Sequence, residues 1–358
     1  MTDRWFCADD GRRLEVMPGF RTEVLDAVRQ HTPRETWTPV DYRLAARKRI
    51  ARAEHVLSRL GDAGAALAGA RVLEVGAGSG LDSVRVAIEG VELAVGIDRE
   101  LVLFGRGSRA RLARRLARRT LARLGLGRDI EAALASVPVR LAAMRADWLA
   151  FPDDTFDIVW SRTALEHVRP LDASLAEIAR VLRPGGLAYH AIDPYFWVRG
   201  CHRKGVVDIP WAHARLTPSE IERFHARDNG RARAARLRAY LEDLNHLTCA
   251  DWKSALERAG LELIDWRVER FPWVEELLRR YPDAASDLLP GVSPEDLTGC
   301  HIEALMGAPD GPGRRAPPSP DRGARAPARA PPASPAGDQS QGLATLTGIQ
   351  ASSPLSAA

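Results

Sequence analysis

Short apolar runs alternate with amphipathic segments along much of the chain, and this alternation indicates an α/β protein. Buried strands are expected where apolar residues follow one another without a break. These runs lie at 72–75, 93–98, 137–142, 156–159, 187–192, 261–268 and 298–306. Helices are expected where apolar residues recur every three or four positions. These segments lie at 21–30, 39–60, 81–89, 106–128, 174–182, 250–260 and 271–281.

The strand at 72–75 leads into the most informative loop of the chain. The strand contains an acid, Glu74, and the loop after it has three alternate glycines, Gly76, Gly78 and Gly80. Glycine permits positive φ and the close approach of a ligand, and the helix that follows offers free N–H groups at its start. In the dinucleotide fingerprint the third glycine lies five residues after the first, which is not the spacing here. The loop instead resembles the first motif of class I S-adenosyl-L-methionine (SAM) dependent methyltransferases.

Two further acids follow the next two strands. Asp98 ends the strand at 93–98, where an acid can accept hydrogen bonds from both ribose hydroxyls of a nicotinamide or SAM cofactor. Asp147 and Trp148 resemble a later family motif, which implies that Asp147 binds the adenine amino group and that Trp148 lies beside the base. The residues expected to bind SAM are Glu74, Gly76, Ala77, Gly78, Ser79, Gly80, Asp98, Arg99, Asp147, Trp148 and Ser161.

Candidate catalytic residues follow the fourth and fifth strands. The pair Glu166-His167 is similar to a family segment at this place, and Asp193 follows the strand at 187–192. His167 is either a general base or substrate-orienting group, or a residue whose hydrogen bond fixes the loop. The segment 180–186, expected as a tight turn, is also similar to a family signature that nicotinamide dehydrogenases lack. The resemblance therefore gives His167, Glu166 and Asp193 as catalytic candidates and no metal.

This resemblance, to type 11-like methylases of bacterial small molecules, implies a fold and a domain organisation. The fold is a Rossmann-like seven-stranded sheet, mostly parallel with an antiparallel last strand. A helical N-terminal cap or lead-in (1–62) precedes the methyltransferase domain (63–306), which carries insertions at 106–128 and 193–250. The helical insertion at 193–250 is expected to build the substrate pocket, with candidates Asp193, Tyr195, His202 and His213. The tail, 307–358, is rich in Pro, Ala, Arg and Gly, and is expected to be disordered.

The segment Arg106 to Arg128 contains many arginines and no acid. Its leucines recur with helical spacing, so it is expected to form a basic amphipathic helix. Two interpretations remain open. The arginines form a solvated face, or they bind an anionic partner such as RNA, phospholipid or a phosphorylated substrate.

Composition narrows the class of protein further. The net charge is +4, and no apolar run has the length of a membrane span or a signal peptide, so a cytoplasmic protein is expected. The cysteines, Cys7, Cys201, Cys249 and Cys300, are scattered, which argues against a disulfide framework, a zinc site and the iron–sulfur cluster of radical SAM enzymes. The histidines near Cys201 and Cys249 do not have zinc-finger spacing either.

The expected activity is methyl transfer from SAM by in-line displacement. The resemblance favours an oxygen or carbon atom of a small molecule as acceptor. Ser161-Arg162-Thr163 stands where nucleic-acid and protein amide or amino-group methylases of this class carry an Asn/Asp-Pro-Pro-Tyr tetrapeptide. The alternative is a non-catalytic SAM-binding scaffold whose arginine-rich helix holds RNA or lipid.

Overall fold

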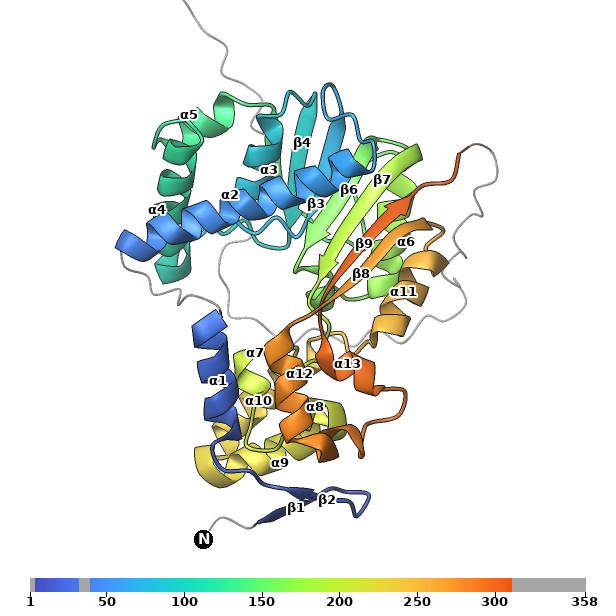
Figure 1. Ribbon diagram of the computed structural model, residues 1–358. Helices are drawn as coiled ribbons and strands as arrows, with labels where there is room; N and C mark the ends of the chain where they lie inside the picture. The colour runs from blue at the N-terminus through green and yellow to red at the C-terminus, as the bar shows by residue number, and fades with distance from the viewer. Residues whose placement is uncertain (1–3, 32–38, 311–358) are drawn as a thin grey trace, which may run out of the picture. The chain divides into compact units, whose positions relative to one another are not determined.

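The computed structural model describes residues 4–31 and 39–310, and its centre is a seven-stranded sheet (Figure 1). The strands are β3 (Arg71–Val75), β4 (Leu93–Asp98), β5 (Val139–Ala143), β6 (Phe156–Arg162), β7 (Leu182–Ile192), β8 (Glu262–Arg270) and β9 (Gly299–Gly307). Their order is β5-β4-β3-β6-β7-β9-β8, and β9 runs antiparallel to both of its neighbours. This confirms the predicted sheet, with its antiparallel last strand placed between β7 and β8.

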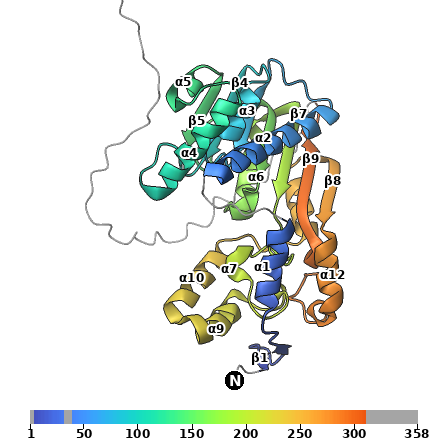
Figure 2. The ribbon, with the colours of Figure 1, turned by 60° about the vertical axis from the view of Figure 1, so that its left-hand side comes forward.

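Helices cover both faces of the sheet (Figures 1 and 2). One face carries α2 (Pro39–Asp62), α3 (Leu81–Ala87) and α4 (Gly107–Arg123), while the other carries α6 (Leu171–Val181) and α11 (Cys249–Arg258). The short helix α5 (Ile130–Ala135) follows α4 and leads into β5. Parallel sheets need such cover because successive side chains of a strand point to opposite faces.

The central strands show this alternation residue by residue. Val72 lies beside Ile158 in the register of β3 and β6, and both pack with the helices α2, α3 and α4. The next pair, Leu73 and Val159, packs on the opposite face with α6 and α11. All four side chains are buried, and full burial of such a side chain contributes about 1.5–3 kcal/mol. The unbroken apolar runs in the sequence therefore reflect strands buried on both faces.

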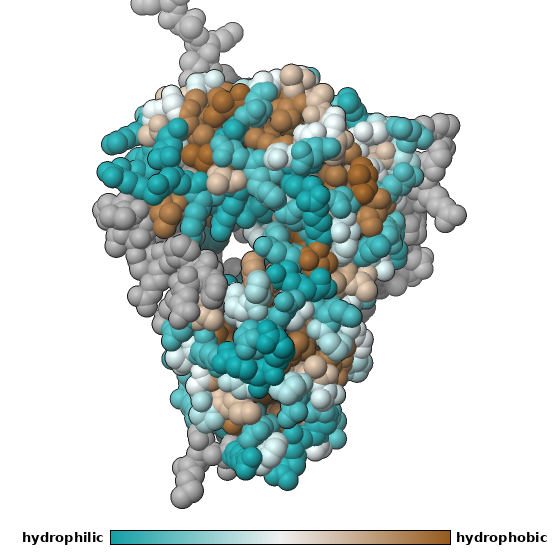
Figure 3. All heavy atoms as spheres, in the orientation of Figure 1, coloured by the Kyte–Doolittle hydropathy of each residue, from teal (hydrophilic) through white to brown (hydrophobic). Residues whose placement is uncertain are grey.

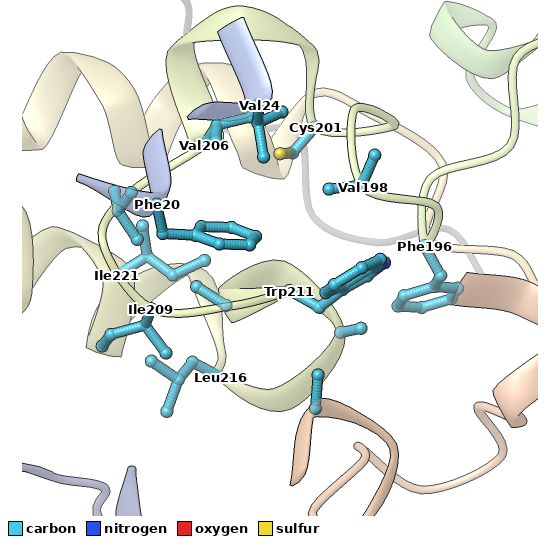
Figure 4. Close-up of a cluster of buried hydrophobic side chains, with 14 of the residues drawn as sticks. Phe20, Val24, Phe196, Val198, Cys201, Val206, Ile209, Trp211, Leu216 and Ile221 are labelled. Carbon is cyan, nitrogen blue, oxygen red and sulfur yellow. The ribbon is translucent and has the colours of Figure 1, made fainter. Parts of the chain in front are cut away.

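A third core joins the N-terminal residues to the segment that follows β7. The hairpin of β1 (Trp5–Cys7) and β2 (Arg13–Glu15) and the helix α1 (Phe20–His31) share it with later elements. These are α8 (Ala212–Arg215), α9 (Pro218–Asn229), α10 (Arg231–Glu242), α12 (Pro272–Arg280), η2 (Pro282–Ala285) and α13 (Pro294–Thr298), and the residues on either side of α7 (His202–Gly205) join them. Figure 4 shows two residues of α1 pointing into this core, Phe20 toward Trp211 and Val24 beside Val206. The hairpin was not predicted, and its core contacts tie residues 5–24 to the expected insertion at 193–250.

One other expectation differs from the structure in detail. Of the predicted turn at 180–186, residues 180 and 181 end α6 and the rest belongs to β7, which already pairs with β6 at Leu182. The pairing then shifts so that Leu187 lies opposite Ile158. Gly185, with φ 69°, lies within the irregular segment between these two pairs. The basic segment 106–128 contains the predicted helix, which is α4, and the loop after it. Together with α5, this segment connects β4 to β5.

Almost all of the predicted tail, 307–358, lies outside the described residues; the strand β9 ends at Gly307. Across residues 4–31 and 39–310, no helix is both long enough and apolar enough to cross a bilayer.

Candidate active site

The glycine loop after β3 is held against the end of β4. The amides of Gly76 and Ala77 donate to the carbonyl of Ile97, over 2.9 and 2.8 Å. Gly76, Gly78 and Gly80 have φ values of 82°, 56° and 68°, which side chains strongly disfavour. The prediction that these positions need glycine is confirmed.

Gly76 and Gly78 differ in what surrounds them. A Cβ on Gly76 would lie 2.3 Å from the Cβ of Ala164, whereas one on Gly78 would meet no heavy atom within 4 Å. Both alanine substitutions strain the backbone, but only Gly76→Ala adds a steric clash. We therefore expect Gly76→Ala to lower the free energy of unfolding by about 1–3 kcal/mol more than Gly78→Ala. Urea denaturation of the two variants measures this difference, and equal stabilities would contradict the close packing of Gly76 on Ala164.

Asp98 connects this loop to β4. One of its carboxylate oxygens accepts a hydrogen bond from the amide of Gly78 at 2.8 Å, and the other accepts from the amide of Glu100 at 3.2 Å. The side chain is only partly buried, so lone pairs remain for a ligand. The next residue, Arg99, is exposed. Asp98 thus supports the loop and offers acceptor oxygens at the edge where β3, β4 and β5 end.

Asp147 follows β5 and is oriented by a neighbour. Arg145 donates to its two carboxylate oxygens, from Nε over 2.8 Å and from Nη2 over 2.5 Å. These bonds hold the pKa of Asp147 below its ordinary value, although burial opposes the shift. The adjacent Trp148 is 77% exposed. A fixed, ionised acceptor therefore stands beside an exposed aromatic ring, an arrangement suited to a base with an amino group.

Glu74 lies inside the protein behind the glycine loop. Its carboxylate accepts a hydrogen bond from the hydroxyl of Ser83 in α3. Burial, together with the nearby charge of Asp82, raises the pKa of Glu74 to about 8. Asp82 in turn pairs with Arg49 of α2 at 3.0 Å and with Arg162 of β6 at 3.7 Å. The loop therefore has a buried pair of acids flanked by two arginines from other elements.

The segment after β6 brings a second pair of acids together. Glu166, in η1 (Leu165–His167), is buried, and among the described residues neither of its carboxyl oxygens has a side-chain hydrogen-bond partner. Burial and the neighbouring charge of Asp193 raise its pKa well above the ordinary value. Asp193 follows β7 and bonds to Nδ1 of His301 at 2.9 Å. Desolvation acts to raise the pKa of Asp193, but the bond to His301 lowers it. The pKa of Glu166 is raised instead, so we infer that Glu166 is the protonated member of this acid pair.

His167 lies next to this acid pair. Its ring stacks on that of His202, with centroids 5.3 Å apart and an angle of 1° between the planes. Burial lowers the pKa of His167, while the carboxylates of Asp243 and Asp193 act in the opposite direction. The imidazole is therefore mostly neutral at pH 7, and acids that stabilise its protonated form lie nearby.

Three other candidates are buried. The hydroxyl of Ser161 and Nδ1 of His190 are 2.8 Å apart, and both side chains are fully buried. Tyr195 and His213 pack edge to face in the third core, where Nε2 of His213 is 2.8 Å from the carbonyl oxygen of Trp197. Within residues 4–31 and 39–310, no cluster of three or more His, Cys, Asp or Glu residues has the arrangement of a metal site.

Sequence reasoning missed Arg49, Asp82 and His301, and it gave Arg162 no role of its own. Asp82 had a local signal, because it is an acid in the first turn of the helix after the glycine loop. Arg162 stood at the end of a predicted strand. Arg49 and His301 had no such signal, since each pairs with a residue far away along the chain.

A protein family described as a methyltransferase domain matches residues 45–265. The chain belongs to this family. Relatives of this chain include one named ubiquinone biosynthesis O-methyltransferase, from Rhizobium rhizogenes, which is 34% identical over 125 residues. That match covers 35% of this chain and 42% of the relative, so this chain spans less than half the length of the curated relatives it matches.

Solved structures similar to this chain have lower identity. A SAM-dependent methyltransferase from Mesorhizobium loti is 18% identical, with 67% of this chain and 92% of that one covered and a TM-score of 0.38. Phosphoethanolamine N-methyltransferase 2 from Haemonchus contortus, solved with SAM, is 20% identical, with 73% of this chain and 53% of that one covered and a TM-score of 0.41.

The family match does not favour the alternative of a non-catalytic scaffold.

Proposed function

We propose that this methyltransferase transfers a methyl group from SAM to a hydroxyl oxygen of a small molecule. The observation that carries the proposal is the row of acids at one edge of the sheet, Glu74, Asp98 and Asp147, in or just after three adjacent parallel strands. Ligands of open α/β sheets bind at this edge. The O-methyltransferase name of the curated relatives supports oxygen as the acceptor atom.

The residues at this edge fit the cofactor. The glycine loop leaves open space at Gly78, where the cofactor would pass close to the backbone. Asp98 would accept hydrogen bonds from the ribose hydroxyls, and Asp147 would accept from the adenine amino group, with Trp148 beside the base. Glu74, behind the loop, would organise it and accept a hydrogen bond from the methionine amino group, whose positive charge would favour ionisation of this carboxyl. When bound, SAM supplies a methyl group on a positively charged sulfur.

The residues after β6 and β7 would handle the acceptor proton. A hydroxyl that becomes a methyl ether must lose its proton, and neutral His167 is suited to take it at a ring nitrogen. Asp193 and Asp243 stabilise the resulting imidazolium by charge, and His301 keeps Asp193 oriented. Glu166, buried and protonated, would donate a hydrogen bond to the acceptor. Alignment of the reactants supplies much of the rate, roughly 7–11 kcal/mol of the barrier.

A labelling experiment tests this function. The full chain is incubated with SAM labelled in the methyl group and with a panel of phenols, hydroquinones, amines and carboxylic acids. We expect label in the phenolic or hydroquinone products. SAM binding without transfer to any member of the panel, or transfer to amines alone, would contradict the proposal.

His167→Gln is expected to lower kcat about 10²–10⁴-fold on the labelled acceptor. In the wild type, kcat/KM should fall as the pH drops through the lowered pKa of His167, below 6.5, because the protonated ring cannot accept a proton. The variant should lose this acid limb while it binds SAM normally by calorimetry. His225→Gln, on α9, is the matched control. An unchanged limb in His167→Gln would show that another group is the base.

A further inference from the structure

The arginines of α4 form a continuous row on its outer side. Arg111, Arg115, Arg118 and Arg119 are spaced so that they share one side of a helix. The buried residues of α4, including Ala117 and Leu121, lie on the opposite side. Arg111, Arg115 and Arg118 are exposed, and Arg119 is half-buried. We call these four residues the outer arginine row; hydrophilic side chains cover this margin of the molecule in Figure 3.

The outer arginine row has no acidic counterpart. Within the described part of the chain, none of its four members has an ion pair with an acid, and α4 contains no Asp or Glu. Other helices pair exposed arginines with acids one turn away, as Arg238 does with Glu242. Like charges four residues apart destabilise a helix. An anionic partner would therefore stabilise α4 by offsetting the repulsion between these arginines. A role as a solvated surface does not explain why the helix has arginines without acids.

The row begins close to the cofactor-binding edge. Arg109, at the start of α4, pairs with Glu100 at 3.2 Å, and the amide of Glu100 donates to Asp98. Phe104, in the loop after β4, is 54% exposed, and the carbonyls of its neighbours Leu103 and Gly105 accept hydrogen bonds from Arg114 of α4. An exposed aromatic ring on a loop bound to a basic helix is a combination that binds the surface of an anionic membrane, where the ring enters the interface and the arginines meet phosphates.

We propose that the outer arginine row and Phe104 dock the protein on an anionic phospholipid surface. The choice of a membrane over RNA rests on the proposed function, because an apolar phenol or hydroquinone, the kind of acceptor expected in the labelling experiment, would be dissolved in a bilayer. Docking through this side would bring the cofactor-binding edge near the lipid that holds the acceptor. The docking itself requires no methyl transfer, and it is measured separately.

Co-sedimentation with vesicles tests the proposal. The full chain is mixed with vesicles of phosphatidylcholine alone, or with about one third phosphatidylglycerol, at low and high salt. We expect binding to the anionic vesicles only, weaker at high salt. The triple variant Arg111→Gln, Arg115→Gln, Arg118→Gln should bind on the order of 100-fold more weakly. Phe104→Ser should weaken binding at both salt concentrations.

A matched variant separates position from net charge. Arg231→Gln, Arg233→Gln and Arg236→Gln remove three exposed arginines of α10 and should leave vesicle binding within about twofold of the wild type. Both triple variants keep residues 311–358, so a loss confined to the first reports on α4. Equal losses in the two variants, equal binding to neutral vesicles, or tighter binding of a single-stranded RNA at the same salt would overturn the proposal. Calorimetry with SAM tests the cofactor site independently.

Discussion

Replacement of Asp98 with alanine is expected to weaken SAM binding by about 100-fold or more. The carboxylate holds the glycine loop through the amide of Gly78, and we propose that it also accepts from the ribose hydroxyls. Hydrogen bonds to charged groups contribute about 1.5–3 kcal/mol each, so the loss of two of them gives this magnitude. Isothermal titration calorimetry of the full chain with SAM measures it.

Two further variants test whether a loss of SAM binding comes from the charge of Asp98 or from a change in the loop. Asp98→Asn keeps an oxygen for the amide of Gly78 but has no charge, so it should keep the loop and still bind SAM weakly. Glu100→Gln changes an exposed neighbour whose amide also bonds to Asp98, and it should bind SAM normally. If Asp98→Ala binds SAM as tightly as the wild type, the ribose assignment is wrong.

The parts of the site that could be predicted are those with a local cause. Gly76, Gly78 and Gly80 must be glycine because a tight loop follows a buried strand within the same few residues. Asp98 ends the next strand, and the parallel order of β3 and β4 places both strand ends at one edge. The positions of the buried strands follow from the unbroken apolar runs, whereas the mostly parallel sheet with its antiparallel last strand was expected from the family resemblance. Periodicity and turn chemistry are sufficient for the strands and for the loop, but not for the order of the strands in the sheet.

The remaining parts depend on contacts between distant segments. Arg49 reaches Asp82 from α2, and His301 reaches Asp193 from β9, so neither pairing has a pattern in the local sequence. The hairpin β1–β2 was missed for a different reason, because its strands have only three residues each. Phe6 is buried there by packing edge to face on Phe224 of α9. Three residues are too few for a periodicity to appear.

Arg162 connects the two halves of the site. It lies at the end of β6 between the acids of the cofactor loop and those near His167, and its charge acts on Glu74, Glu166 and Asp193. Each of these acids is buried or partly buried, and a nearby cation offsets part of the cost of ionising it. The proposed cofactor and acceptor sites therefore share one positive charge, and loss of a proton on one side changes the field on the other.

Glu74→Gln is expected to stabilise the protein at alkaline pH. In the unfolded chain this carboxyl ionises near its ordinary pKa of 4.5, whereas its pKa in the folded protein is about 8. Between these values the folded protein keeps a proton that the unfolded chain releases, so rising pH destabilises the folded state. Each pH unit in this window costs about 1.4 kcal/mol. The full window sets an upper limit of about 5 kcal/mol on the gain from glutamine.

Urea denaturation without SAM, at pH 4 and pH 8.5, measures the effect. Glutamine keeps an oxygen for the hydroxyl of Ser83, but its amide adds a buried donor that costs about 1–3 kcal/mol if unpaired. The net gain at pH 8.5 should therefore be about 2–4 kcal/mol, and at pH 4 the variant should have no advantage because Glu74 is then protonated in both states. Glu92→Gln, at an exposed glutamate paired with Arg71, is the control and should show little pH dependence. A destabilised Glu74→Gln at pH 8.5 would mean that the buried carboxylate is ionised and held by Arg49 and Arg162, and the raised pKa would be refuted.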